Sequence, residues 1–86
     1  MPWKRMTERQ ADVLGVLSDG KTYTPSEIGE YHLPIGLSSA RAALDGLERR
    51  KYVSAVYTGT HRRGRSYEIT DAGTEALLKH DEEVQS

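Results

Sequence analysis

The sequence predicts a single, mainly helical α+β domain, in which three helices form the core, a two-stranded β-hairpin follows, and a fourth helix comes last. Three observations predict this fold. Two threonines begin capping boxes, apolar residues recur at helical spacing in the first half of the chain, and two short runs of β-branched and aromatic residues follow them. At 86 residues, the chain has room for one modest core.

The first two helices each begin with a capping box, in which a threonine is followed three residues later by Gln or Glu. These boxes are Thr7-Glu8-Arg9-Gln10 and Thr24-Pro25-Ser26-Glu27, and the second has proline where a helix tolerates it best. We therefore expect a helix over about residues 7–18, which Asp19-Gly20 ends, and a short helix from residue 24 through about Tyr31.

The third helix is predicted from Ser38 to Arg50, with Ser38 or Ser39 as its N-cap. A turn over residues 32–36 precedes it, because Pro34 disfavours helical backbone in the residue before it and a glycine follows. At 100° per residue, the inward face of this helix carries Leu37, Ala40, Leu44 and Leu47, and its outward face carries Ser38, Ser39, Ala42, Asp45, Gly46 and Arg49. Arg41 lies at the boundary between the two faces.

The hairpin is predicted from two strands, residues 52–57 and 66–69, that flank the tip segment, residues 58–65. Alternating residues in the two strands are suited to a half-buried sheet: Val53, Ala55, Tyr57, Tyr67 and Ile69. Thr70-Asp71 then begins the last helix, which we expect to fray into an acidic tail. We therefore predict one domain over residues 1–80 and a flexible tail over 81–86.

The charge is distributed unevenly along the chain, although the formal net charge is only -1. Residues 41–65 hold seven Arg or Lys against Asp45 and Glu48, a net charge of +5. Residues 71–86 hold Lys79 against five acidic residues, a net charge of -4. A polyanion responds to the local patch rather than to the sum, so these numbers favour an anionic partner for residues 41–65.

The sequence lacks residues that several classes of function require. The chain has no cysteine, and no apolar run approaches the ~18 residues that a membrane span requires. We therefore expect a soluble, intracellular protein with no membrane partner, which is cytoplasmic and associated with the nucleoid.

A match to the phosphate-loop pattern G-x-x-x-x-G-K-[ST] occurs at residues 15–22. That loop must join a strand to a helix N-terminus, whereas Gly15 is predicted inside a helix, so we interpret the match as chance. The three histidines are far apart in sequence, and no Ser/His/Asp grouping converges. We expect no enzymatic activity, no cofactor and no metal.

The tip segment is rich in arginine, with Arg62, Arg63 and Arg65 beside Gly59 and Gly64. Glycine lets a hairpin tip close tightly, and a thin cationic tip suits the narrow, negative minor groove of DNA. The alternative is that these arginines only protect an edge strand from aggregation.

The third helix offers a modest set of groups to DNA. The hydroxyls of Ser38 and Ser39 can bond phosphates or bases, Ala42 can contact a thymine methyl, and Asp45 can accept from cytosine N4. The basic end of the helix, residues 49–51, complements the helix dipole and can bind phosphate as well, since the two roles are compatible. Strong sequence specificity is not predicted from these residues.

The order of these elements resembles the winged helix-turn-helix regulators, most closely the MarR and PadR groups. Residues 37–53 resemble their recognition helix and its exit into the wing. The string Gly64-Arg65-Ser66-Tyr67-Glu68-Ile69-Thr70-Asp71-Ala72-Gly73 resembles their second wing strand and the helix after it. The resemblance runs from Thr7 to about Leu78. It implies a segment from Ser38 to Arg49 in the major groove, with the arginines of the tip segment along the backbone or the minor groove.

The sequence also departs from that family. Pro34 lies in a turn that looks longer than usual, and Lys51 stands where the family often has glycine. The sequence ends soon after the fourth helix, so we expect it to lack the long dimerisation helices of those regulators. A homodimer would then form through Trp3, the N-terminal segment or the acidic last helix.

We therefore predict a winged helix-turn-helix protein that binds double-stranded DNA, as a transcriptional regulator or an architectural protein. The alternative is a protein-interaction module of a larger complex. It is motivated by the acidic last helix and by small outward residues that would let another helix approach closely, namely Ser39, Ala42, Ala43 and Gly46. The predicted DNA-binding residues are Ser38, Ser39, Arg41, Ala42, Asp45, Arg49, Arg50, Lys51, His61, Arg62, Arg63 and Arg65.

Overall fold

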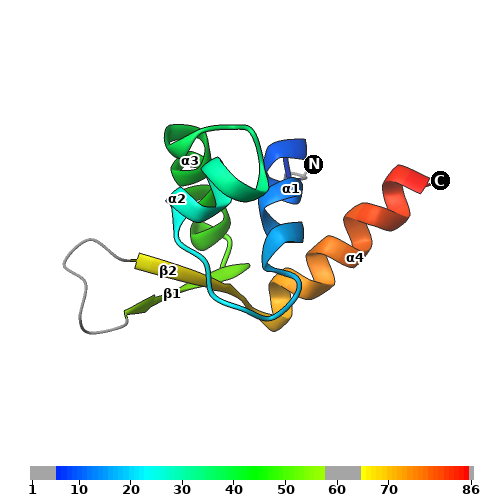
Figure 1. Ribbon diagram of the computed structural model, residues 1–86. Coiled ribbons are helices and arrows are strands. Elements are labelled where there is room, and N and C mark those ends of the chain that lie inside the picture. The colour runs from blue at the N-terminus through cyan, green and yellow to red at the C-terminus, as the bar shows by residue number, and fades with distance from the viewer. Residues whose placement is uncertain (1–5, 58–64, 86) are drawn as a thin grey trace.

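The computed structural model describes residues 6–57 and 65–85 and confirms a mainly helical α+β fold (Figure 1). Its elements follow the predicted order. They are α1 (Glu8–Leu17), α2 (Pro25–Glu27), the π-helical turn η1 (Ile28–His32), α3 (Leu37–Arg49), β1 (Val53–Tyr57), β2 (Arg65–Ile69) and α4 (Asp71–Gln85).

The core lies where α1, α3 and η1 meet, with the sheet closing one end. Its largest fully buried side chains are Leu14, Leu17, Ile28, Leu44, Leu47 and Val13. Each such side chain contributes roughly 1.5–3 kcal/mol of hydrophobic stabilisation when it leaves water. The apolar stripe of α3 faces this core, and the opposite face of α3 is left at the surface.

Both predicted capping boxes are present. The Thr7 hydroxyl accepts from the Gln10 amide at 3.0 Å, and the Gln10 side chain accepts from the Thr7 amide at 3.1 Å. Thr24 and Glu27 repeat this arrangement at 3.1 and 2.9 Å. Each box satisfies two backbone groups and fixes where its helix begins.

The start of α3 differs from the prediction, because neither Ser38 nor Ser39 caps it. The N-cap is Gly36, at φ 85°, and the helix begins at Leu37 without a side-chain cap. The Gly36 amide donates to the Gly29 carbonyl at 3.0 Å, and a Cβ on Gly29 would lie 2.7 Å from the Gly36 carbonyl carbon. This close backbone crossing sets the position of the helix start, so both serines fall within the first turn.

The sheet pairs β1 with β2 in antiparallel register, from Val53 opposite Ile69 to Tyr57 opposite Arg65. Tyr23, before α2, adds a bridge that the sequence did not predict. Its amide donates to the Tyr67 carbonyl at 3.1 Å, and the Tyr67 amide donates back at 2.8 Å. The hairpin is thereby attached to the segment that joins α1 and α2.

The last helix extends further than predicted. α4 continues through Gln85 and includes most of the segment expected as a tail from Asp81. No glycine or proline follows Gly73, and several residues that follow it are strong helix formers, so the sequence contains no stop signal. In Figure 1, α4 projects from the body on the side opposite the hairpin.

Candidate nucleic-acid interface

The outward face of α3 is the centre of the candidate site. Five predicted DNA-binding side chains are exposed on it: Ser38, Arg41, Ala42, Asp45 and Arg49. Arg41, predicted at the boundary, is exposed with the others. Because these residues lie opposite the buried stripe of α3, the fold directs them to solvent as one group.

Arg41, Asp45 and Arg49 are spaced four residues apart and therefore form one row along α3. Within the described part of the chain, neither arginine forms an ion pair with a carboxylate. The row thus presents two cationic groups that no carboxylate of residues 6–57 or 65–85 pairs with, and one acidic group lies between them.

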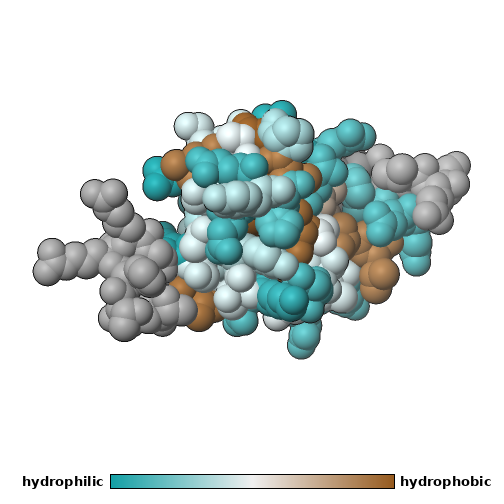
Figure 2. Space-filling model, viewed as in Figure 1, coloured by the Kyte–Doolittle hydropathy of each residue, from teal (hydrophilic) through white to brown (hydrophobic). Residues whose placement is uncertain are grey.

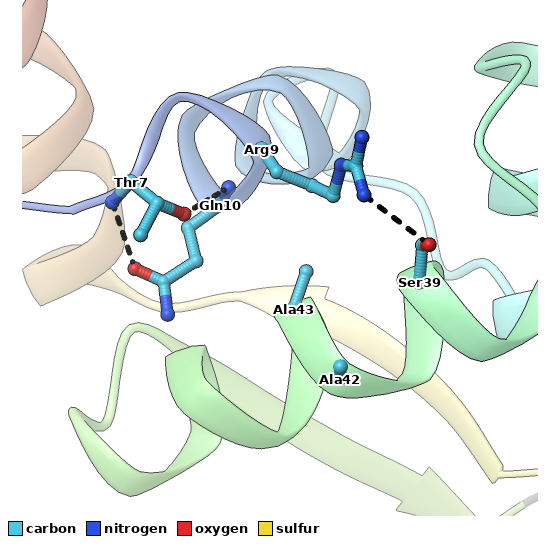
Figure 3. A pocket seen from close by; sticks show the side chains of 6 residues that line it. All are labelled: Thr7, Arg9, Gln10, Ser39, Ala42 and Ala43. Carbon is cyan, nitrogen blue, oxygen red and sulfur yellow. Dashed lines mark hydrogen bonds between the residues drawn. The ribbon is translucent and has the colours of Figure 1, made fainter.

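The flank of α3 beside the row is occupied by α1 (Figure 3). Ser39 is half-buried, and its hydroxyl accepts from Arg9 Nη1 at 3.2 Å. Gly46 faces Gln10 so closely that a Cβ would touch the end of that side chain. Ser39 and Gly46 were predicted on the outward face, but they instead lie against α1.

Arg9 was missed by the sequence analysis. It lies 30 positions before Ser39, and no local pattern relates residues so far apart, so only the packing of α1 on α3 brings them together. The positive charge of Arg9 now stands beside the N-terminal half of α3.

The small residues of α3 that suggested close approach by a helix of another protein instead lie at or beside the contact between α3 and α1. Ala43 is only 5% exposed, and it lines a hollow between α1 and α3 together with Ala42. With Ser39 and Gly46 also against α1, the helix that approaches α3 closely is α1 itself. The small residues of α3 are therefore not an open stripe for another protein, although this finding tests neither the acidic last helix nor the protein-interaction module itself.

The C-terminal end of α3 is fixed by backbone hydrogen bonds. The Lys51 amide donates to the Glu48 carbonyl at 2.9 Å, and the Tyr52 amide donates to the Leu47 carbonyl at 3.0 Å. This pairing is a Schellman motif, which requires a left-handed residue, and Lys51 adopts φ 64° there. Lys51 is exposed, whereas Arg50 is half-buried and engaged in a further interaction.

The hairpin carries the remaining predicted residues. Arg65 is exposed at the start of β2 and has an interaction partner. His61, Arg62 and Arg63 lie outside the described residues, as does Trp3.

α3 and the hairpin lie on one side of the molecule, and α4 projects from the other (Figure 1). Figure 2 shows hydrophilic groups over much of the visible face, with hydrophobic atoms in several separate places, α4 among them. Leu78 in α4 is 59% exposed.

One polar pair fixes the loop after α1. The Tyr23 hydroxyl donates to the Asp19 carboxylate, which raises the pKa of Tyr23 above 10.0 and lowers the pKa of Asp19 below 3.8. The Asp19 carboxylate also accepts from the Lys21 amide at 2.9 Å. Because Tyr23 bridges to β2, this pair links the end of α1 to the hairpin.

The structure gives no setting for a phosphate loop. Gly15 lies inside α1, and Gly20, at φ 82°, lies in the turn that follows it. Within residues 6–57 and 65–85, no three His, Asp or Glu side chains gather where they would hold a metal ion. Nor does this part of the chain contain a helix long and apolar enough to cross a membrane.

The structure is similar to solved transcriptional regulators. The transcriptional repressor CouR, bound to a 23-mer DNA duplex, shares 27% identity at a TM-score of 0.82, over 95% of this chain and 57% of that chain. The regulator BldR from Sulfolobus solfataricus shares 22% identity at 0.80, over 93% and 56%. MarR from E. coli shares 22% identity at 0.74, over 85% and 53%.

These neighbours are MarR-family winged-helix transcriptional regulators, so the predicted winged-helix fold and the MarR resemblance are confirmed. The chain spans little more than half the length of the structures that it matches. No family model matches the sequence, and no curated protein matches it either.

Proposed function

We propose that this protein is a DNA-binding protein of the transcription-regulator type, which inserts the outward face of α3 into the major groove. The observation that carries the proposal is the cationic row on α3, whose two arginines are exposed and form no ion pair within the described part of the chain. The 27% identical CouR repressor, solved on a DNA duplex, supports it.

The dimensions of α3 suit this role. Its 13 residues make a rod about 20 Å long, and a helix with its side chains is about 10–12 Å across, close to the roughly 12 Å width of the major groove. Arg41 and Arg49 would contact phosphates or guanine edges, and the Ser38 hydroxyl would bond a phosphate or a base. Ala42 would meet a thymine methyl, and Asp45 would accept from cytosine N4.

The rest of the predicted interface extends along the DNA backbone. Lys51, exposed at the end of α3, would contact a phosphate, as would Arg50 if it exchanges its present partner for DNA. Arg65 stands at the end of the two strands that is nearest the hairpin tip, from which Arg62, Arg63 and His61 would continue along the backbone or the minor groove. These hairpin contacts are proposed from the sequence.

The experiment is a salt titration of duplex binding by fluorescence anisotropy. Each phosphate contact contributes about -0.9 to the slope of log K against log salt concentration. Arg41→Gln and Arg49→Gln should each make the slope shallower by about this amount if the side chain contacts a phosphate. An arginine that contacts only a base edge should instead lower the affinity for particular sequences.

The matched control is Lys79→Gln, which removes one positive charge from exposed α4, on the side away from the hairpin. It should leave the slope nearly unchanged. Equal effects from all three substitutions would contradict a localised interface. Wild-type protein that does not bind a duplex at low salt would remove the proposal.

Sedimentation with and without a random duplex would separate this function from a protein-interaction module. Binding of the duplex would appear as a faster-moving complex, and the same measurement would report whether one copy or two bind. A stoichiometric protein partner recovered in a pull-down, without any duplex complex, would favour the module.

A further inference from the structure

The hollow between the start of α1 and the outer flank of α3 has a polar lining that the sequence analysis did not anticipate (Figure 3). It is open to solvent and measures about 280 Å³. Its lining residues are Thr7, Arg9, Gln10, Ser39, Ala42 and Ala43.

The side-chain oxygens of this lining each already accept a hydrogen bond. Gln10 Oε1 accepts from the Thr7 amide, Thr7 Oγ1 accepts from the Gln10 amide, and Ser39 Oγ accepts from Arg9. The capping box also fixes the orientation of the Gln10 amide, because only its oxygen can accept from a backbone N–H.

The groups that remain in the lining are mainly donors. Arg9 uses one of its five N–H groups on Ser39 and keeps four. The hydroxyl hydrogens of Thr7 and Ser39 are uncommitted within the described part of the chain, whereas the Gln10 NH₂ faces Gly46 on α3 and points away from Arg9 and Ser39. A donor-rich hollow with one guanidinium fits an oxygen-rich anion.

The charge of Arg9 remains available to that anion. Arg9 is exposed, and no carboxylate pairs with it in residues 6–57 or 65–85. Glu8 precedes it and Asp12 follows one turn later on α1, but neither lines the hollow. Ala42 and Ala43, with short side chains, leave the space in front of the guanidinium open.

The position of the hollow indicates which anion it meets. It borders the face of α3 that carries Arg41, Asp45 and Arg49, on the side where α1 begins. A helix in the major groove nearly fills it, so a sugar-phosphate backbone runs along each flank of the helix. The hollow would open toward one of these backbones.

We propose that this hollow binds one backbone phosphate of the duplex, with Arg9 as its principal contact and the Ser39 hydroxyl as an additional donor. The proposal rests on the proposed DNA binding. It assigns α1 a part in positioning α3 on the duplex, because a phosphate contact fixes orientation without reading sequence.

The test is the salt dependence of duplex binding for Arg9→Gln, Arg9→Lys and the control Lys79→Gln. Arg9→Gln should make the slope of log K against log salt concentration shallower by about 0.9, and should lower the affinity about tenfold. Arg9→Lys should restore the slope because it restores the charge. Lys79→Gln should change neither quantity appreciably.

Gln10→Glu gives a second test that preserves the fold. Glutamate serves equally well at this position of a capping box, so α1 should keep its start, while a negative charge enters the lining of the hollow. The affinity for the duplex should fall while the melting temperature of the protein stays the same or rises.

The outcomes separate this proposal from the proposed function. Wild-type binding with unchanged slope and affinity in Arg9→Gln and Gln10→Glu would overturn the phosphate site and leave DNA binding by α3 intact. A slope that Arg9→Lys fails to restore would assign Arg9 a structural role beside Ser39 and would also overturn it. Absence of wild-type duplex binding at low salt would remove both.

Discussion

Replacing Lys51 by glycine tests how the exit of α3 is held. Lys51 adopts φ 64°, a conformation that costs a residue with a Cβ about 1–2 kcal/mol. The Schellman bonds keep it there, and the Lys51 carbonyl accepts from the Thr70 hydroxyl at 2.7 Å. Glycine removes the strain, while its greater unfolded-state entropy costs about 0.5–1 kcal/mol. Glycine should therefore be more stable than alanine at this position by about 0.5–1 kcal/mol.

Alanine is the matched comparison because both substitutions remove the lysine charge near the C-terminus of α3, worth about 0.3–1 kcal/mol. Lys51→Gly should melt about 2–8 °C above Lys51→Ala and close to the wild-type protein. Thermal unfolding followed by circular dichroism would measure this order. Equal or higher stability in Lys51→Ala would refute the idea that backbone strain is stored at this residue.

Three further predictions concern packing, protonation and charge. Gly29→Ala should destabilise the fold by roughly 1–3 kcal/mol in urea unfolding, because its Cβ would press on the Gly36 backbone. Because the pKa of Tyr23 is raised, its bond to Asp19 stabilises the fold below pH ~10, and this stabilisation is lost as the pH rises through the folded pKa of Tyr23. Because the pKa of Asp19 is lowered, the stabilisation is also lost on acidification, as the pH falls below ~4. Asp19→Asn should move the Tyr23 pKa back toward 10.0 in an NMR titration, and no movement would contradict the pairing. Asp45→Asn should weaken binding to duplexes that carry cytosine at the contacted position, by up to about 1–3 kcal/mol, because the carboxylate accepts from cytosine N4. Stronger binding to every duplex would contradict this contact and would indicate that the carboxylate repels a phosphate.

The features that the sequence predicted well are those encoded locally. The capping boxes at Thr7 and Thr24 depend on residues three positions apart, and the alternation in β1 and β2 depends on neighbouring residues. The glycine that follows α1 likewise has the expected positive φ at Gly20. In each case, the residues that determine the structure are close together in sequence, so the local sequence pattern is enough to predict it.

The features that were missed depend on residues far apart in the chain. A serine before an apolar stripe is a good N-cap, yet Gly36 takes that position because its backbone crosses Gly29. Gly46 looks like part of an open stripe until α1 packs over it, and Arg9 reaches Ser39 by the same packing. Helical periodicity separates an inward face from an outward one, but it does not say which neighbouring helix covers the flank.

The arrangement of the elements explains how a chain with a net charge of -1 can still approach a polyanion. α4 spans the acidic part of the sequence, whereas α3 and the hairpin lie on the other side of the body, and the Cα atoms extend 43 Å along the longest axis. The Debye length at 0.15 M salt is about 8 Å, so a duplex that meets the α3 surface is largely screened from α4. At lower salt, the acidic end would repel the duplex and orient the protein with α3 foremost. Neutralising the acidic residues of α4 should therefore change the association rate at low salt more than the dissociation rate, because steering acts before contact.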